Sequence, residues 1–342
     1  MTSSVSSRPD VTSNALHTAA LPERARSLLR DALVWDAHSG FSPSPKTDLN
    51  ELSRWEKANV DYLSINVGFD GYPWMETIRT LAAFRHWLEL RPDRFILVDK
   101  AADVLRAKKE GKMGITFDLE GAVTLGGQIE MVALYHRLGV RQMHFVYNIN
   151  NEAGGGCHDD DQGLTDFGRE IVKEANRLGV LIDLSHVGYR TSLEVCERSQ
   201  KPVVYSHSNP KDVADHPRNI TEEQMRACIS TGGLIGVSGV GRMIGDLSAS
   251  SKHYARAIDM TVERVGIKNV GIGLDHTWEV FDDVGTPSKF WPMEHYQQSS
   301  KFVNPGQLPE ITELLLKLGY GDEDIRDVFG ANYLRVVERV WR

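Results

Sequence analysis

Short apolar stretches alternate along this chain with longer stretches in which apolar residues recur every three or four positions. The short stretches are rich in β-branched and aromatic residues, as is typical of strands buried on both faces of a parallel sheet. The longer stretches have one apolar face and predict amphipathic helices. The eight predicted strands are 33–36, 62–67, 114–119, 142–147, 180–184, 202–206, 234–238 and 270–274.

The predicted helices fall between these strands. Thr165 is a plausible N-cap and Gly179 a plausible C-terminal glycine for one of them. Eight strands that alternate with helices favour a parallel (β/α)8 barrel of the TIM type over an open doubly wound sheet. The helices expected between strands are 75–90, 101–109, 129–138, 165–178, 190–199, 222–230 and 252–265, and two extra C-terminal helices, 309–318 and 322–341, follow the last strand.

Two segments do not fit the alternation. The N-terminal region is rich in Ser, Thr and Ala, so we expect residues 1–27 to form a flexible tail ahead of a single barrel domain over residues 28–342. Residues 279–307 are rich in proline and aromatic residues without a clear period. So long a connection predicts a lid or a loop that covers a substrate.

Composition excludes several classes of partner. The net charge of −8 argues against nucleic acid, which requires a clustered positive surface. There is no apolar stretch of about 20 residues, so we expect no membrane span. The three cysteines, Cys157, Cys196 and Cys228, cannot all pair within the chain and have no Cys-x-x-Cys spacing. Reduced thiols and a cytoplasmic location are the simplest expectation.

Histidines and carboxylates follow five of the predicted strands at their carboxyl ends. In a (β/α)8 barrel these ends meet at one mouth, where active sites lie. A single histidine in such a place is usually structural, but the repetition favours a metal site, because imidazole nitrogen and carboxylate oxygen suit Zn²⁺, Mn²⁺ or Fe²⁺. The segments concerned are Asp36-Ala37-His38, Asp118-Leu119-Glu120, Asp183-Leu184-Ser185-His186, Ser206-His207-Ser208 and Asp275-His276.

Several of these segments also resemble a known family. The stretch Leu181-Ile182-Asp183-Leu184-Ser185-His186-Val187 and the stretch Ser206-His207-Ser208 are similar to the two histidine motifs of the membrane (renal) dipeptidase family of zinc metallopeptidases. Pro217-Arg218-Asn219-Ile220 resembles its substrate-binding turn, and Leu119-Glu120-Gly121 its bridging glutamate motif. The resemblance extends from about residue 28 to the C-terminus and identifies the chain as a divergent soluble member.

The resemblance implies a hydrolase that cleaves the amide bond of dipeptides, or of a related small amide with a free carboxylate, by a metal-activated water. Glu120 would bridge two Zn²⁺ ions. His186 and His207 would complete one metal site, and His38 would belong to the other. Asp275 would hold the attacking water, and Arg218 and Asn219 would bind the substrate. Tyr147 would both bind the substrate and assist catalysis.

Two positions depart from the family pattern. Gly40 stands where the family has a second metal-binding carboxylate in its His-x-Asp motif, so either one or two ions are expected. Tyr147 stands where the family has a histidine, with His144 three residues earlier. A tyrosine hydroxyl still donates a hydrogen bond, but it is neutral.

These departures leave two alternatives open: a catalytically impaired member that acts as a binding protein, or a mononuclear barrel enzyme that is not a peptidase. The expected partner is a small molecule, a dipeptide or modified amino acid, and the resemblance allows a homodimer. The acidic stretch from His158 to Asp161 is interpreted as a solvated loop rather than a cation site. For His276, lining the site and packing are equally compatible with the sequence.

Overall fold

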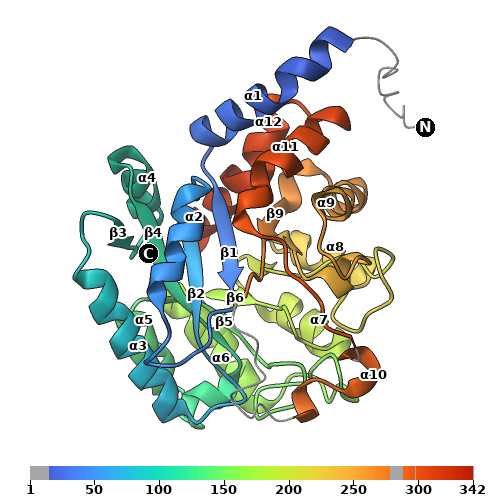
Figure 1. The fold of residues 1–342 in the computed structure, drawn as a ribbon. Coiled ribbons are helices and arrows are strands. Elements are labelled where there is room, and N and C mark those ends of the chain that lie inside the picture. Colours follow the sequence, from blue (N-terminus) through green and yellow to red (C-terminus); the bar gives the residue numbers. More distant parts are fainter. Residues whose placement is uncertain (1–14, 278–287, 297, 342) are drawn as a thin grey trace.

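The computed structural model describes residues 15–277, 288–296 and 298–341. Eight parallel strands follow one another around the sheet, with their order in space matching their order in sequence (Figure 1). The first and last strands are linked by hydrogen bonds from the Leu274 amide to the Asp36 carboxylate and from the Asp275 amide to the His38 carbonyl. The nearly closed parallel barrel confirms the predicted fold. Its strands are β1 (Trp35–Ser39), β2 (Tyr62–Phe69), β4 (Met113–Glu120), β5 (Val140–His144), β6 (Leu181–Asp183), β7 (Val203–Tyr205), β8 (Leu234–Ser238) and β9 (Val270–Gly273).

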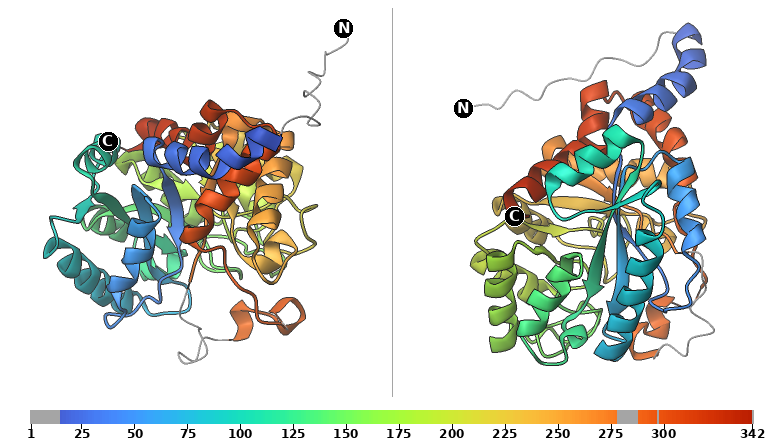
Figure 2. Two further views of the ribbon diagram at one scale, coloured as in Figure 1. Left: turned by 45° about the horizontal axis from the view of Figure 1, so that its top comes forward. Right: turned by 90° about the vertical axis from the view of Figure 1, so that its left-hand side faces the viewer.

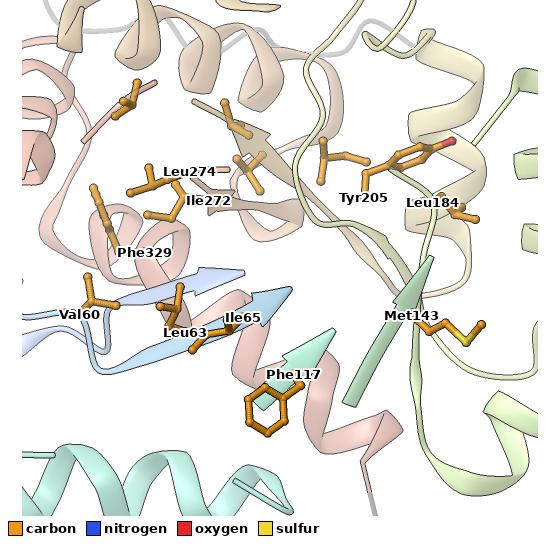
Figure 3. Packing of buried hydrophobic residues seen from close by; sticks show 14 of the residues in the cluster. Val60, Leu63, Ile65, Phe117, Met143, Leu184, Tyr205, Ile272, Leu274 and Phe329 are labelled. Atoms are coloured by element: carbon orange, nitrogen blue, oxygen red, sulfur yellow. The ribbon is translucent and has the colours of Figure 1, made fainter. Parts of the chain in front are cut away.

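Helices surround the barrel, as the two views in Figure 2 show. One face of each strand is apolar and packs under these helices. Figure 3 shows part of this layer, in which Leu63, Phe117, Met143 and Ile272 are buried. The helices of the outer layer are α2 (Ser53–Lys57), α3 (Trp74–Glu89), α4 (Ala101–Glu110), α5 (Glu130–Arg137), α6 (Asp166–Leu178), α7 (Tyr189–Arg198), α8 (Glu222–Ser230) and α9 (Ser251–Val265).

The C-terminal helix α13 (Asn332–Val340) closes the amino-terminal end of the barrel. The ring of Tyr333 stacks 5.6 Å from that of Trp35 and lies against the glycines of two strands. A Cβ atom on Gly236 or Gly271 would lie within about 2.3 Å of Tyr333, so only glycine leaves room for this ring. With this end filled by side chains, the carboxyl ends of the strands are left for a functional site.

Several expectations differ from the structure. Residues predicted as a flexible tail include most of helix α1 (Ala15–Asp31), whose buried Ala25, Leu28 and Leu29 pack in the core beside α11 (Leu308–Lys317). The helix predicted over 322–341 is divided into α12 (Asp322–Arg326), a π-helical turn over Asp327–Ala331, and α13. The short strand β3 (Phe95–Leu97), which pairs with β4 outside the barrel order, was not predicted.

The connection predicted as an irregular lid lies partly outside the described residues. Its described part contains short helical segments: a 3₁₀ turn over Ser288–Phe290, helix α10 (Met293–Tyr296) and a 3₁₀ turn over Pro305–Gln307. In Figure 1, α10 lies at the end of the barrel toward which β1 points, opposite α1 and α11. This part of the chain therefore covers the carboxyl ends of the strands.

Candidate metal centre

The carboxyl ends of β1 and β4 place the first donors of the site. Asp118 and Glu120 lie two residues apart on β4, and side chains two apart on a strand share one face. The pairing of β1 with β2 shifts register between Asp36 and Ser39. Such a bulge re-aims a side chain, and here it accompanies the turn of His38 toward Glu120. The His38 Nε2 atom lies 3.4 Å from the Glu120 Oε1 atom.

The other two imidazoles come from the loops after β6 and β7. The Nε2 atom of His186 lies 3.0 Å from Glu120 Oε1, and that of His207 lies 3.8 Å from the same oxygen. The two Nε2 atoms are 2.9 Å apart. His186 has a left-handed backbone with φ of 71°, a conformation that non-glycine residues adopt rarely and that recurs at functional sites. The structure thus brings all four predicted metal ligands together.

Each imidazole is held through its other ring nitrogen. His38 Nδ1 donates to the Asp118 carboxylate at 3.2 Å, and His186 Nδ1 donates to the Asn148 Oδ1 atom at 2.7 Å. His207 Nδ1 lies 2.8 Å from the Ser206 hydroxyl. These contacts fix the rings so that all three Nε2 atoms face Glu120, the arrangement typical of histidines that bind a metal.

The donor set fits a metal ion. The Nε2 atom of His38 is buried and has no hydrogen-bond partner, although the Glu120 carboxylate and the His207 imidazole each place a possible ligand atom within 4.8 Å of the His38 ring. Three imidazole nitrogens and one carboxylate oxygen are a common set for Zn²⁺, and they also suit Mn²⁺ and Fe²⁺. His38, Glu120, His186 and His207 would hold the ion.

The electrostatics of the centre support this reading. Burial raises the pKa of Glu120 to about 7, although nearby His38 and His144 oppose the shift. Burial, reinforced by cationic neighbours, lowers the pKa of His186 and of His207 well below the ordinary value, so both rings are neutral and offer lone pairs. For His38, burial opposes protonation, but the carboxylates of Asp118 and Glu120 outweigh it and raise the pKa. A bound cation would take the place of that proton.

Asp275 lies at the edge of the centre, beside the position of the missing family carboxylate. Its Oδ1 atom is 3.7 Å from His38 Nε2, and burial raises the pKa of its carboxyl group. Its backbone is also left-handed, with φ of 51°. A Cβ atom added to Gly40 would lie 3.4 Å from Asp275 Oδ1, an ordinary contact distance, so a side chain at position 40 would point at the same edge of the centre.

Tyr147 and Arg218 contact the centre from the side of the mouth. The Tyr147 ring stacks on that of His186 at 4.3 Å, and burial raises the pKa of its hydroxyl, which therefore stays protonated. The buried Asp70 carboxylate accepts the Tyr147 amide at 2.9 Å and fixes this loop. The Nη2 atom of Arg218 donates to His186 Nε2 at 3.1 Å, and its guanidinium is almost fully buried.

The structure also separates some candidates from the centre. Asp36 accepts the Trp55 indole and the Leu274 amide, so it cannot replace the missing carboxylate ligand. His276 packs against Trp55 and contacts the Val303 carbonyl. The amide nitrogen of Asn219 donates to two backbone carbonyls, so its role in substrate binding stays a prediction.

The acidic stretch after Cys157 has a structural role that the sequence did not predict. Asp161 accepts hydrogen bonds from Gly163 and from the amide and hydroxyl of Thr191, and Asp159 accepts the Asn150 amide. Asp161 therefore ties loops together, whereas Asp159 and Asp160 are exposed, as expected for a solvated loop. All three cysteines are unpaired in the structure, as expected.

The sequence analysis assigned no role to two buried groups beside the centre, Asp118 and His144. Asp118 was seen only as part of a strand end, although its two-residue spacing from Glu120 was a signal for a shared face. His144 is fully buried, with Nδ1 at 2.9 Å from the Leu119 carbonyl and Nε2 at 2.9 Å from the Asp183 carboxylate. Burial opposes protonation of His144, but Asp183 outweighs it and raises the pKa. Both ring nitrogens therefore lie close to oxygen atoms, and the Asp183 carboxylate favours the protonated form of this buried ring.

A nearly closed parallel barrel with imidazoles and carboxylates gathered at the carboxyl ends of its strands defines the class of metal-binding (β/α)8 barrels. The family model for membrane dipeptidase (peptidase family M19) matches residues 24–342. The chain belongs to this family, which confirms the resemblance seen in its motifs.

Relatives and solved structures agree with this membership. Dipeptidase tcpJ of Claviceps purpurea (strain 20.1) is 28% identical over 273 residues, and dipeptidase verJ of Clonostachys rogersoniana is 27% identical over 270 residues. The matches cover 78% and 77% of this chain but 60% and 65% of those relatives. The chain thus spans less than two thirds of the length of the curated relatives.

Among solved structures, an amidohydrolase from Pseudomonas aeruginosa is 32% identical, with a TM-score of 0.82 over 93% of this chain and 99% of that one. A metallo peptidase from Rhodobacter sphaeroides, liganded with a phosphinate mimic of the dipeptide L-Ala-D-Ala, shares the fold with a TM-score of 0.73 and 22% identity over 91% of this chain and 99% of that one. Among the helices within the described residues, none is long and apolar enough to cross a membrane.

Proposed function

We propose that the protein is a metal-dependent dipeptidase, which cleaves the amide bond of a dipeptide or of a related small amide with a free carboxylate. The observation that carries this proposal is the convergence of three imidazole Nε2 atoms on one oxygen of Glu120, with Arg218 in contact with the same cluster. A metal ion and a guanidinium at adjacent positions match the two ends of such a substrate, its scissile carbonyl and its carboxylate.

A Zn²⁺ ion in this centre would supply Lewis acidity, polarising the scissile carbonyl and lowering the pKa of a water molecule. The remaining chemistry belongs to side chains. The carboxylate of Asp275, beside His38, accepts the proton of the attacking water and delivers it to the leaving amine. The Tyr147 hydroxyl, which stays protonated, donates a hydrogen bond to the oxygen that gains negative charge.

Arg218 binds the substrate carboxylate in this proposal. Its Nη2–H group now donates to His186 Nε2, and one lone pair cannot serve both a guanidinium and a metal ion. When the centre is loaded, this donor is therefore free for the substrate. A planar guanidinium binds a carboxylate through two parallel hydrogen bonds, which also fixes the orientation of the substrate.

Removal of the metal provides the direct test. The purified protein should hydrolyse Ala-Ala, lose this activity after treatment with a chelator, and regain it on addition of Zn²⁺, Mn²⁺ or Fe²⁺. Elemental analysis of the same samples should follow the activity. Hydrolysis that persists in metal-free protein would exclude a metal-dependent reaction, and a metal-loaded protein that cleaves no dipeptide would leave the binding-protein alternative.

The number of ions depends on position 40, so we expect Gly40→Asp to increase the metal content by about one ion per chain, because it restores a carboxylate ligand. The Cβ atom of residue 40 would make only ordinary contacts with Asp275 and Thr277, and the aspartate can therefore be accommodated. Gly40→Ala, which adds the Cβ atom without a ligand, is the matched control. An equal metal content in wild type and Gly40→Asp would show that another group already completes the site.

A further inference from the structure

A second group of imidazoles lies beside Arg218, outside the metal centre. The ring centroids of His158, His216 and His295 lie between 5.5 and 6.2 Å from one another. The Tyr296 hydroxyl is 2.9 Å from His158 Nε2, and the Tyr296 ring lies edge-on to His216 at 5.5 Å. The four residues come from the loop after β5, the loop after β7 and helix α10. We call them the mouth cluster.

Buried donors of the mouth cluster and of Arg218 lack partners. The Nδ1 atom of His158, the Nε2 atom of His216 and the Nε atom of Arg218 are all buried without a hydrogen bond. His216 Nδ1 accepts the Arg218 amide at 3.2 Å. A neutral His216 must therefore carry its proton on Nε2, which makes this atom a donor without an acceptor. Unsatisfied buried donors are costly, and their concentration at one place indicates a site for an acceptor.

The surroundings of these imidazoles are cationic. Burial lowers the pKa of His158 and of His216 to about 3, and the positive charge of Arg218 and, for His216, of Arg242 adds to this shift. Arg242 lies over the Tyr296 ring at 4.8 Å. Glu294 contacts His295 at 3.4 Å but is itself exposed. An anion bound here would meet donors and positive charge together.

We propose that the mouth cluster binds a carboxylate on the side chain of the C-terminal residue, so that the preferred substrates are dipeptides ending in an acidic amino acid. This inference rests on the proposed dipeptidase function. Arg218 binds the α-carboxylate, and two donors bind the second carboxylate of the same residue. One is His216 Nε2–H, and the other is the single proton that the hydrogen-bonded pair of neutral His158 and Tyr296 leaves unused. The two carboxylates of one acidic residue lie close together. Arg218 and His216 are also close to each other, because the Arg218 amide donates a hydrogen bond to the His216 ring.

The test compares substrates that differ only in charge. With the zinc-loaded protein, kcat/KM for Ala-Asp should exceed that for Ala-Asn by about tenfold or more, the size of one hydrogen bond to a charged group. In His216→Phe, which keeps an aromatic ring but has no donor, this ratio should fall at least about fivefold. If His216 had only a structural role, its replacement would lower kcat/KM for Ala-Asp and for Ala-Asn by the same factor. The ratio of the two values therefore distinguishes recognition of the acidic side chain from a general loss of activity. His253→Phe is the matched control, because His253 lies on α9 away from the mouth, and it should keep the wild-type ratio.

Direct binding gives a second readout that does not depend on turnover. Free aspartate should bind the zinc-loaded protein about tenfold or more tightly than asparagine, and His216→Phe should remove most of this difference. Equal cleavage of Ala-Asp and Ala-Asn would overturn the inference and leave the dipeptidase function intact. If no dipeptide were cleaved, the proposed function would fail. In that case, a preference for aspartate that His216→Phe abolishes would still support the mouth cluster as a site for an acidic side chain, whereas equal binding of both amino acids would overturn it.

Discussion

His186→Ala should retain little metal and should lose dipeptide hydrolysis by a factor of about a thousand or more, because stabilisation of charge by a metal ion is worth several kcal/mol. His186 contributes the nitrogen nearest to Glu120, at 3.0 Å, and its ring is fixed by Asn148. Removing the imidazole deletes one of the four donors of the centre. Elemental analysis and kcat/KM for Ala-Ala measure the two effects on the same preparation.

The control for this prediction is His253→Ala, which removes an imidazole from helix α9. This ring is partly exposed and pairs with Asp246, so its loss should leave metal content and activity unchanged. Circular dichroism should show that both variants are folded, since the alanine at position 186 removes buried polar atoms rather than core packing. A His186→Ala protein with full metal content and full activity would disprove the assignment of the centre.

Arg218→Met should raise KM for Ala-Ala by about 30-fold or more, because breaking a buried pair between a guanidinium and a carboxylate costs at least about 2 kcal/mol. Methionine keeps much of the apolar stem of the side chain, so the change mainly removes the guanidinium. For the C-terminal amide of the same dipeptide, which lacks the negative charge, the increase in KM should be much smaller. Steady-state kinetics on the two substrates measure this difference.

Arg190→Met provides the matched control for Arg218→Met. Arg190 lies exposed on α7 and pairs with Glu194, four residues away, so its loss should affect neither substrate. An equal increase in KM for the dipeptide and its amide in Arg218→Met would mean that the guanidinium does not recognise the carboxylate. It would then be an electrostatic or structural neighbour of His186.

The sequence alone determined the fold and the position of the centre. Strands buried on both faces give continuous apolar runs, and their alternation with amphipathic helices left the parallel barrel as the favoured architecture. The barrel in turn places every strand end at one mouth. For this reason His38, Glu120, His186 and His207 could be grouped although they are separated by up to 169 positions in the chain.

Two local predictions of secondary structure were wrong, and both lie where the sequence pattern alone does not determine the structure. The segment predicted as a strand over 142–147 leaves the sheet after His144, because the chain then turns to carry Tyr147 to the mouth. Helix α1 was missed because the Ser- and Thr-rich residues before it were grouped with it, and because Pro22 stands inside it. Its contacts with α11 stabilise the helix despite this proline.

Only the tertiary structure decided how the donors are held and what surrounds them. Which nitrogen of each imidazole is free depends on Asp118, Asn148 and Ser206, and such hydrogen bonds are set by geometry rather than by spacing. The mouth cluster joins His158 to Tyr296 across 138 positions and depends on the path of α10, which no periodicity predicts. The sequence determined which residues reach the mouth, because strand order fixes where strands end. The tertiary structure decided their orientation, because it alone sets the contacts between loops.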